Sequence, residues 1–209
     1  FQQYSLFGQI SKSWLDEKLG LTFGLRTDAN NYNERMNNPL DQISGRLALT
    51  YALSPRTSLT AGVANYYQLP PMMTLSYRNS GSLDNKDVAE YLQSWHYVTG
   101  FKWDTPFNSR FSVEAFLKTY PNYLLSLRDS VSVAHLGADF GVFGNYPVDF
   151  SSKGRAYGFE VFYQQRMFKG FYGMLSYTLS WSDYMEKTNP YIPSSGDSRH
   201  IVNLVLGKR

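Results

Sequence analysis

One stretch in the last third of the chain, residues 154–181, limits the possible folds more than any other. It reads GRAYGFEVFYQQRMFKGFYGMLSYTLSW, and apolar and polar residues alternate on both sides of Phe168-Lys169-Gly170. Odd positions are large and apolar on both sides, whereas even positions are mostly small or polar. A period of two with one apolar and one polar face is typical of a β-strand. The stretch therefore predicts a β-hairpin with a broad aromatic face.

The parity of the two runs also predicts the register of this hairpin. Because odd positions are apolar in both arms, the connection must contain an odd number of residues. We expect a three-residue loop in which Gly170 adopts positive φ as a G1 bulge. The pairs that should then face each other on the apolar side are Tyr163–Leu175, Val161–Tyr177, Phe159–Leu179 and Tyr157–Trp181.

Two classes of protein contain such hairpins. In a soluble sandwich the apolar faces of two sheets pack together, whereas in an outer-membrane barrel the apolar face meets lipid. Aromatic residues make up 17% of the chain, which is high for a soluble domain and suits the girdles of a barrel. No segment approaches the roughly 18 apolar residues of a membrane helix, and barrel strands are compatible with that.

The alternating pattern recurs along the whole chain, and no segment predicts a convincing helix. Residues 69–71 (Leu-Pro-Pro) break the ladder before Met72–Tyr77, since proline cannot donate to a sheet. The strand that begins at Arg110 either ends at Tyr120 or runs on past Pro121 to Leu127. Nine strands are predicted, at residues 3–14, 18–30, 42–53, 57–68, 94–103, 110–120, 154–167, 171–185 and 198–209.

The connections between these strands alternate strictly between short and long. Transmembrane barrels have short periplasmic turns and longer extracellular loops, whereas a sandwich has no reason to keep such alternation. We therefore predict an all-β fold, part of a large antiparallel transmembrane β-barrel. The segments expected outside the cell are residues 31–41, 78–93, 129–153 and 186–197.

Five segments, in order, resemble one family. LGLTFGLRTDANNY resembles the GLRYD strand of TonB-dependent outer-membrane receptors, and AGVANYYQLPPMMTL resembles their G-x-Y-Q-P-P segment. VEAFLKTYPNYL, GRAYGFEVFYQQ and DSRHIVNLVLG are similar to three further strands of these receptors. The matches span nearly the whole chain, and the aromatic loops are similar to those of receptors from Bacteroidetes-type bacteria.

The resemblance implies a 22-stranded barrel in the bacterial outer membrane, plugged by an N-terminal globular domain. Residues 1–209 would be one partial barrel domain, with the plug and the flanking strands outside it. Such receptors import scarce, bulky ligands (iron chelates, vitamins such as cobalamin, glycans or peptides) with energy from TonB. The implied partners are outer-membrane lipid, the plug, TonB, and a surface lipoprotein or larger assembly; no cofactor is implied.

Other functions are weighed against this importer. A structural or adhesive barrel subunit of an outer-membrane complex is the main alternative, and a passive porin is another. An enzyme would need a nucleophile, a base and an orienting group at one rim, and the sequence contains no such set. His96, His135 and His200 are far apart and lack metalloprotease spacing. The net charge of +3 without a basic run speaks against nucleic acid.

Three sets of candidate residues follow from the strand faces and loops. Charged residues on the polar face should line the lumen, where they contact the plug and lumen water unless they steer substrate: Arg26, Asp28, Arg46, Lys102, Glu114, Lys118, Glu160 and Arg166. Aromatic residues at the strand ends should form the membrane girdles: Trp14, Trp95, Trp103, Tyr157 and Trp181. Aromatic and amide side chains of the upper lumen and long loops should bind substrate, unless they only pack loops together: Tyr32, Tyr66, Gln68, Tyr120, Asn122, Phe140, Phe143, Tyr146 and Tyr191.

Overall fold

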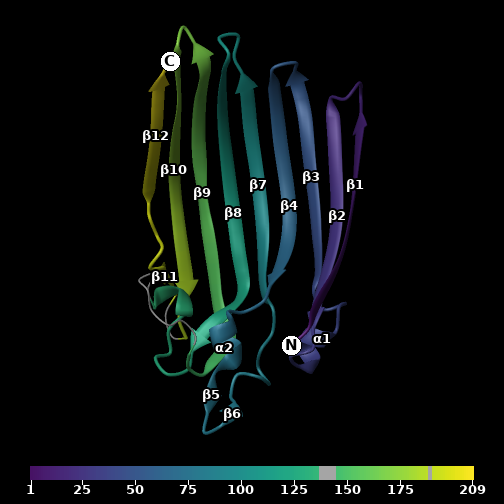
Figure 1. The fold of residues 1–209 in the computed structure, drawn as a ribbon, viewed down its shortest axis with the longest axis vertical. Coiled ribbons are helices and arrows are strands. Elements are labelled where there is room, and N and C mark those ends of the chain that lie inside the picture. Colours follow the sequence, from purple (N-terminus) through teal and green to yellow (C-terminus); the bar gives the residue numbers. More distant parts are fainter. Residues whose placement is uncertain (137–144, 188–189) are drawn as a thin grey trace.

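The computed structural model describes residues 1–136, 145–187 and 190–209. In this part of the chain, ten strands form one antiparallel sheet, and nine of them are long (Figure 1). The chain runs up and down through the sheet in sequence order, so that neighbours along the chain are mostly neighbours in space. The long strands are β1 (Gln3–Trp14), β2 (Leu19–Asn30), β3 (Ile43–Ser54), β4 (Thr57–Gln68), β7 (Leu92–Asp104), β8 (Ser109–Ser126), β9 (Val148–Phe168), β10 (Phe171–Met185) and β12 (His200–Lys208).

These nine strands confirm the predicted all-β fold. The short strand β11 (Tyr191–Pro193) pairs with β10, and β5 (Arg78–Asn79) and β6 (Ser82–Leu83) form a separate small hairpin. β8 continues through Pro121 to Ser126, and its register shifts twice beyond Tyr120. β9 begins at Val148, inside the segment that the sequence predicted as a loop.

The hairpin of β9 and β10 has the predicted register. Tyr157 lies opposite Trp181 and Phe159 opposite Leu179, and the other two predicted pairs are also present. The predicted three-residue loop is wrong, because Phe168 and Phe171 pair and leave a two-residue turn of Lys169 and Gly170. Both turn residues have positive φ (50° and 82°), and a bulge after Phe171 restores the parity.

The two ends of the sheet differ in their connections. All the short turns lie at one end, and the longer connections lie at the other, which we call the loop end (Figure 1). Three short helices occupy the loop end, although the sequence predicted none: α1 (Glu34–Asn37), α2 (Met72–Ser76) and the 3₁₀ helix η1 (Val133–His135). Each spans five residues or fewer, which is too short to carry the 3.6-residue periodicity that marks a helix in a sequence.

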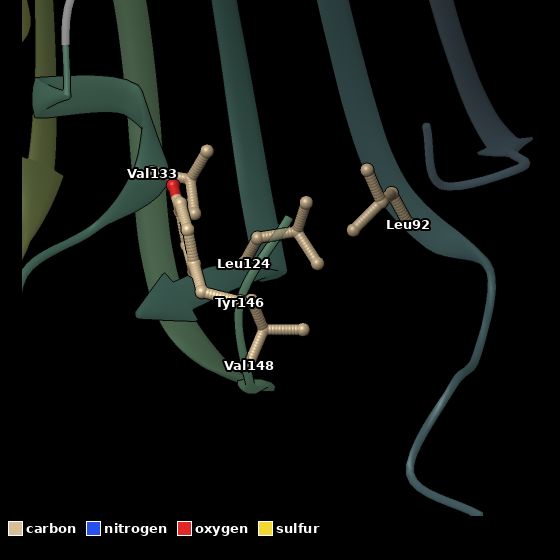
Figure 2. Close-up of a cluster of buried hydrophobic side chains, with 5 residues drawn as sticks. All are labelled: Leu92, Leu124, Val133, Tyr146 and Val148. Atoms are coloured by element: carbon tan, nitrogen blue, oxygen red, sulfur yellow. The ribbon is translucent and has the colours of Figure 1, made fainter. Parts of the chain in front are cut away.

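Buried apolar residues gather at the loop end. One cluster consists of Leu92, Leu124, Val133, Tyr146 and Val148, whose side chains converge from β7, β8, η1 and β9 and the residues next to them (Figure 2). A second cluster consists of Met36, Leu75, Ala89 and Tyr91 and joins α1 to α2.

Along the strands themselves, by contrast, large apolar side chains are exposed. Leu47, Tyr97 and Leu175, on three different strands, are each 43–44% exposed. A sheet that buries so little of its apolar face needs a non-aqueous surrounding for that face. Among the residues that the structure describes, no helix is long and apolar enough to span a membrane.

Candidate functional site

The sheet has two faces of different chemistry. The register places Phe23, Leu47 and Val63 side by side on one face, which we call the apolar face. The opposite face, the polar face, carries the even-numbered positions of these strands and of β7 and β8, such as Arg46 and Lys118. All but one of the charged residues that the sequence assigned to the lumen occupy this polar face: Arg26, Asp28, Arg46, Lys102, Glu114, Lys118 and Glu160. Arg166 lies between Gln165 and Phe168, where the register of β9 and β10 shifts.

Near the loop end, the charges of the polar face are mostly positive. Arg26 binds Asp28 through two hydrogen bonds of 2.8 and 2.7 Å, and this ion pair neutralises both groups. Arg46 lies opposite Ala64, Ala64 opposite His96, and His96 opposite Lys118, so that these residues form one row across four strands. No ion pair involves Arg46 or Lys118 within the described part of the chain.

An aromatic contact connects the members of this row. The Tyr66 ring lies 4.7 Å from the His96 ring, and the Arg46 guanidinium lies 5.7 Å from the Tyr66 ring centroid. The sequence predicted Tyr66 as a substrate-binding residue and Arg46 as a lumen-lining residue, with no connection between the two. The contact between them depends on the pairing of β3, β4 and β7 and was not predicted.

Midway along the polar face, two carboxylates face each other. Glu114 of β8 lies directly opposite Glu160 of β9, and both side chains are exposed. Glu160 accepts a hydrogen bond of 3.3 Å from Thr178, and neither carboxylate has an ion pair within the described residues. Like charges directly opposite on neighbouring strands are destabilising unless a cation comes between them.

The end of the polar face near the short turns has a balanced charge. Asp104 pairs with Arg110 at 2.8 Å and with Lys102 at 3.8 Å. These residues come from β7 and β8 and join the two strands next to their turn. The polar face is thus cationic near the loops, anionic in the middle and paired near the turns.

At the loop end, asparagine side chains hold the loops together. Asn85 is 1% exposed; its amide donates to the carbonyls of Thr74 and Tyr146, and its oxygen accepts from the Val148 amide. Asn122 donates to Glu90 at 2.8 Å and to the Tyr91 carbonyl at 2.9 Å, and it accepts from the Gln93 amide. These bonds satisfy backbone groups that no strand pairs, and they make the loops one connected layer.

Several of the substrate candidates are engaged in this layer. Tyr32 donates to the Leu75 carbonyl, and Tyr146 is 8% exposed within the cluster of Figure 2. Tyr120 packs against Tyr123 and Tyr184, with ring centroids 6.2 and 5.7 Å away.

The other substrate candidates are more accessible. Tyr66 and Tyr191 are each 36% exposed, Gln68 is exposed, and Arg155 lies 4.4 Å from the Tyr191 ring. Phe140 and Phe143 lie outside the described residues.

Two phenols of the loop layer have altered acidity. Burial raises the pKa of Tyr32, which nearby Arg78 opposes only in part. Burial also raises the pKa of Tyr91, whose hydroxyl accepts a 2.8 Å hydrogen bond from the Asn30 amide. Both rings therefore stay neutral well into alkaline pH.

The five girdle candidates lie on the apolar face, but Tyr157 of β9 and Trp181 of β10 lie well inside their strands. Tyr157 and Trp181 are stacked, with centroids 5.3 Å apart and an angle of 7°, and Trp95 stacks on Tyr97. These rings lie toward the loop end, whereas Trp14 and Trp103 lie next to the short turns. The described residues contain no group of three or more His, Asp or Glu side chains placed to hold a metal ion.

Comparisons with known proteins agree with this two-faced sheet. Residues 1–207 match the family described as TonB dependent receptor-like, beta-barrel. No protein with curated annotation is similar enough in sequence to count as a relative.

Solved structures share the fold at low sequence identity. The copper transporter OprC has a TM-score of 0.60 and 17% identity, over 86% of this chain and 29% of its own. The ferripyoverdine receptor of the outer membrane of Pseudomonas aeruginosa, bound to ferripyoverdine, has a TM-score of 0.66 and 15% identity, over 98% and 26%. A complex of FpvAI with pyocin S2 has a TM-score of 0.67 and 14% identity, over 98% of this chain and 26% of its own. The chain spans less than a third of the length of each of these proteins.

Proposed function

The chain belongs to the TonB dependent receptor-like β-barrel family of the bacterial outer membrane, and we propose that it is the wall of a ligand importer driven by TonB. In this proposal, residues 1–209 contribute about nine of 22 strands, and a plug domain fills the lumen. The ligand is scarce and bulky: an iron chelate, a vitamin, a glycan or a peptide. The ferripyoverdine receptor, with its bound ferripyoverdine, supports the iron-chelate class, and the copper transporter OprC supports passage of a metal through this fold.

The observation that carries the proposal is the difference between the two faces of the sheet. A passive structural barrel needs an apolar exterior, but it does not need a lumen wall with separate zones of positive and negative charge. The opposed carboxylates of Glu114 and Glu160 repel each other, and a cation from a part of the protein beyond these strands would offset that repulsion. We propose that a basic side chain of the plug supplies it.

The test of this function is uptake by cells that carry the full-length receptor. Labelled ferric chelates, cobalamin, oligosaccharides and peptides are offered to matched cells with and without TonB. We expect one of these classes to accumulate only when both the receptor and TonB are present. Equal accumulation without TonB would point to a passive pore.

The adhesive or structural alternative has one observation in its favour. The β5–β6 hairpin projects beyond the loop end, and Arg78, Asn79, Ser80 and Gly81 are exposed there (Figure 1). Binding of a partner cell or protein without any uptake, lost when this hairpin is shortened, would favour that alternative.

A further inference from the structure

We propose that the polar face near the loop end binds an anionic group of the imported ligand, a carboxylate or a phosphate, through Arg46, His96 and Lys118 with Tyr66 beside them. This inference rests on the proposed import function and narrows its ligand class. It does not depend on the residues of the loop layer, which are engaged in holding the loops together.

The position of Arg46 depends on the absence of a side chain at Gly24. A Cβ atom at Gly24 would lie only 2.9 Å from Cγ and 3.1 Å from Cδ of Arg46, so the arginine stem lies across this glycine. A hollow of about 430 Å³ opens here, lined by Phe7, Gln9, Gly24, Arg26 and Arg46, together with Gly8 and Leu25. Its size suits a small charged group of a larger ligand, and Gln9, Arg26 and Arg46 supply its polar groups.

Aromatic rings extend the site from this hollow across the sheet. The Arg46 guanidinium lies 5.7 Å from the Tyr66 centroid, and the Tyr66 and His96 rings are 4.7 Å apart. Lys118 follows directly opposite His96. The site therefore offers a planar guanidinium, an imidazole and an ammonium along one row, with a flat surface between them.

The charges of the site are not balanced by the protein around it. Asp28 is 4% exposed and is held by the bidentate pair with Arg26, so it is not available to Arg46. Glu114 lies four residues from Lys118 along β8, and within the described residues no ion pair joins the two: the Lys118 ammonium lies over the Phe116 ring, 5.5 Å from its centroid. An arginine without a carboxylate partner presents a planar fork that matches carboxylate and phosphate groups.

The location of the site favours a ligand over the plug as the source of the anion. Arg46 is the fourth residue of β3, roughly 10 Å from the loop end of that strand. A ligand that enters between the loops would meet this row before it reaches Glu114 and Glu160. A carboxylate of the plug is the competing source, and the experiment is chosen to distinguish the two.

The test measures the charge preference of a cysteine placed next to the site in the full-length receptor. Ser94 lies on the polar face opposite Tyr66, and Ser94→Cys is a near-isosteric change. Intact cells are treated with an anionic methanethiosulfonate reagent that carries a sulfonate, and in parallel with its cationic trimethylammonium counterpart. The modification rate for each reagent is divided by the rate of the same reagent with a small free thiol in solution, which corrects for intrinsic reactivity. All steps use cells without TonB.

We expect the sulfonate reagent to react faster than the cationic one, and citrate to slow it. Arg46→Gln and Lys118→Gln should each lower the ratio of the two rates by roughly threefold or more, as expected for loss of a unit charge about 10 Å away. Arg110→Gln is the matched control, because it removes a cation of the same face near the turns, well beyond a screening length. Its ratio should stay unchanged.

Two outcomes would overturn the proposal. One is a ratio that neither Arg46→Gln nor Lys118→Gln changes. The other is a cysteine that neither reagent modifies until the receptor is denatured, which would assign the site to a contact with the plug. Because the assay needs neither TonB nor uptake, its failure leaves the import function standing, and a failure of uptake leaves the anion site standing.

Discussion

At the scale of single residues, the loop end depends on a few carboxamides and phenols. Asn33 is one example: it caps α1 by accepting from the Met36 amide and also donates to the carbonyls of Lys86 and Ala89. Asn85 is more deeply placed and joins three segments at once. Such side chains replace the backbone pairing that the loops lack.

Asn85→Ala should loosen the loop layer. It leaves the carbonyls of Thr74 and Tyr146 and the Val148 amide without this partner, and each lost bond to a buried group costs about 1–3 kcal/mol. We expect faster trypsin cleavage at Lys86 on intact cells that carry the receptor. Asn79→Ala, which alters an exposed asparagine of β5, is the control, and this variant should be cleaved at the same rate as the unaltered receptor. Equal cleavage rates for the Asn85→Ala and Asn79→Ala variants would contradict this role of Asn85.

Alkaline pH should open the same layer. The pKa values of Tyr32 and Tyr91 are raised by burial, so the stability they contribute is fully present below the ordinary tyrosine pKa of about 10 and is lost as pH rises through the raised values. We expect cleavage of the loops by subtilisin, which needs no charged residue at the cleavage site, to increase above about pH 10. The double variant Tyr32→Phe, Tyr91→Phe should show a smaller rise, since a phenyl ring cannot ionise and only the other buried phenols, such as Tyr120, still can. A Tyr4→Phe receptor, altered at a half-exposed ring, should keep it.

At the scale of elements, alternate residues of each strand face opposite sides of the sheet, one apolar and one polar. Leu47, Leu49 and Tyr51 lie on the apolar face of β3, between matching residues of β2 and β4. Along the middle of the strands, charged residues lie on the other face, because a charge facing lipid at mid-membrane costs roughly 2–4 kcal/mol. The charged residues that share the apolar face, such as Lys12 and the pair of Arg155 and Asp183, lie toward the strand ends. The sheet therefore keeps its register without a buried core along the strands.

Spin labels on adjacent residues of β3 and β9 should report these two environments. Labels at Leu49 and Phe159 should be relaxed by oxygen and protected from a water-soluble relaxant, because these positions face lipid. Labels at Ala48 and Glu160 should show the opposite preference. Equal access at neighbouring positions would refute the assignment of the faces.

At the scale of the whole molecule, the sheet is open in the part that the structure describes. β1 pairs there only with β2, and β12 only with β10, so both present a row of unpaired backbone groups. Each unpaired N–H or C=O costs several kcal/mol in lipid. We propose that further strands of the intact barrel pair with these two edges.

Residues 1–209 alone should therefore not form a stable barrel. When they are expressed and refolded in detergent, we expect no heat-modifiable, protease-resistant species. The full-length receptor, refolded in parallel, should give one. A compact monomer from residues 1–209 would mean that β1 and β12 can close on each other or need no partner.

The sequence by itself determined the strands, their faces and the register of the β9–β10 hairpin. These features follow from a period of two, which is local and which the contrast between lipid and water imposes on every strand. Tertiary structure decided the rest. A two-residue turn at Lys169 followed by a bulge gives the same parity as a three-residue loop, so the alternating pattern could not distinguish the two. The helices α1 and α2 are too short for a periodic signal, and packing around Met36 and Leu75 specifies them. The row from Arg46 to Lys118 joins residues that are far apart in the chain, and only the pairing of four strands brings their charges together.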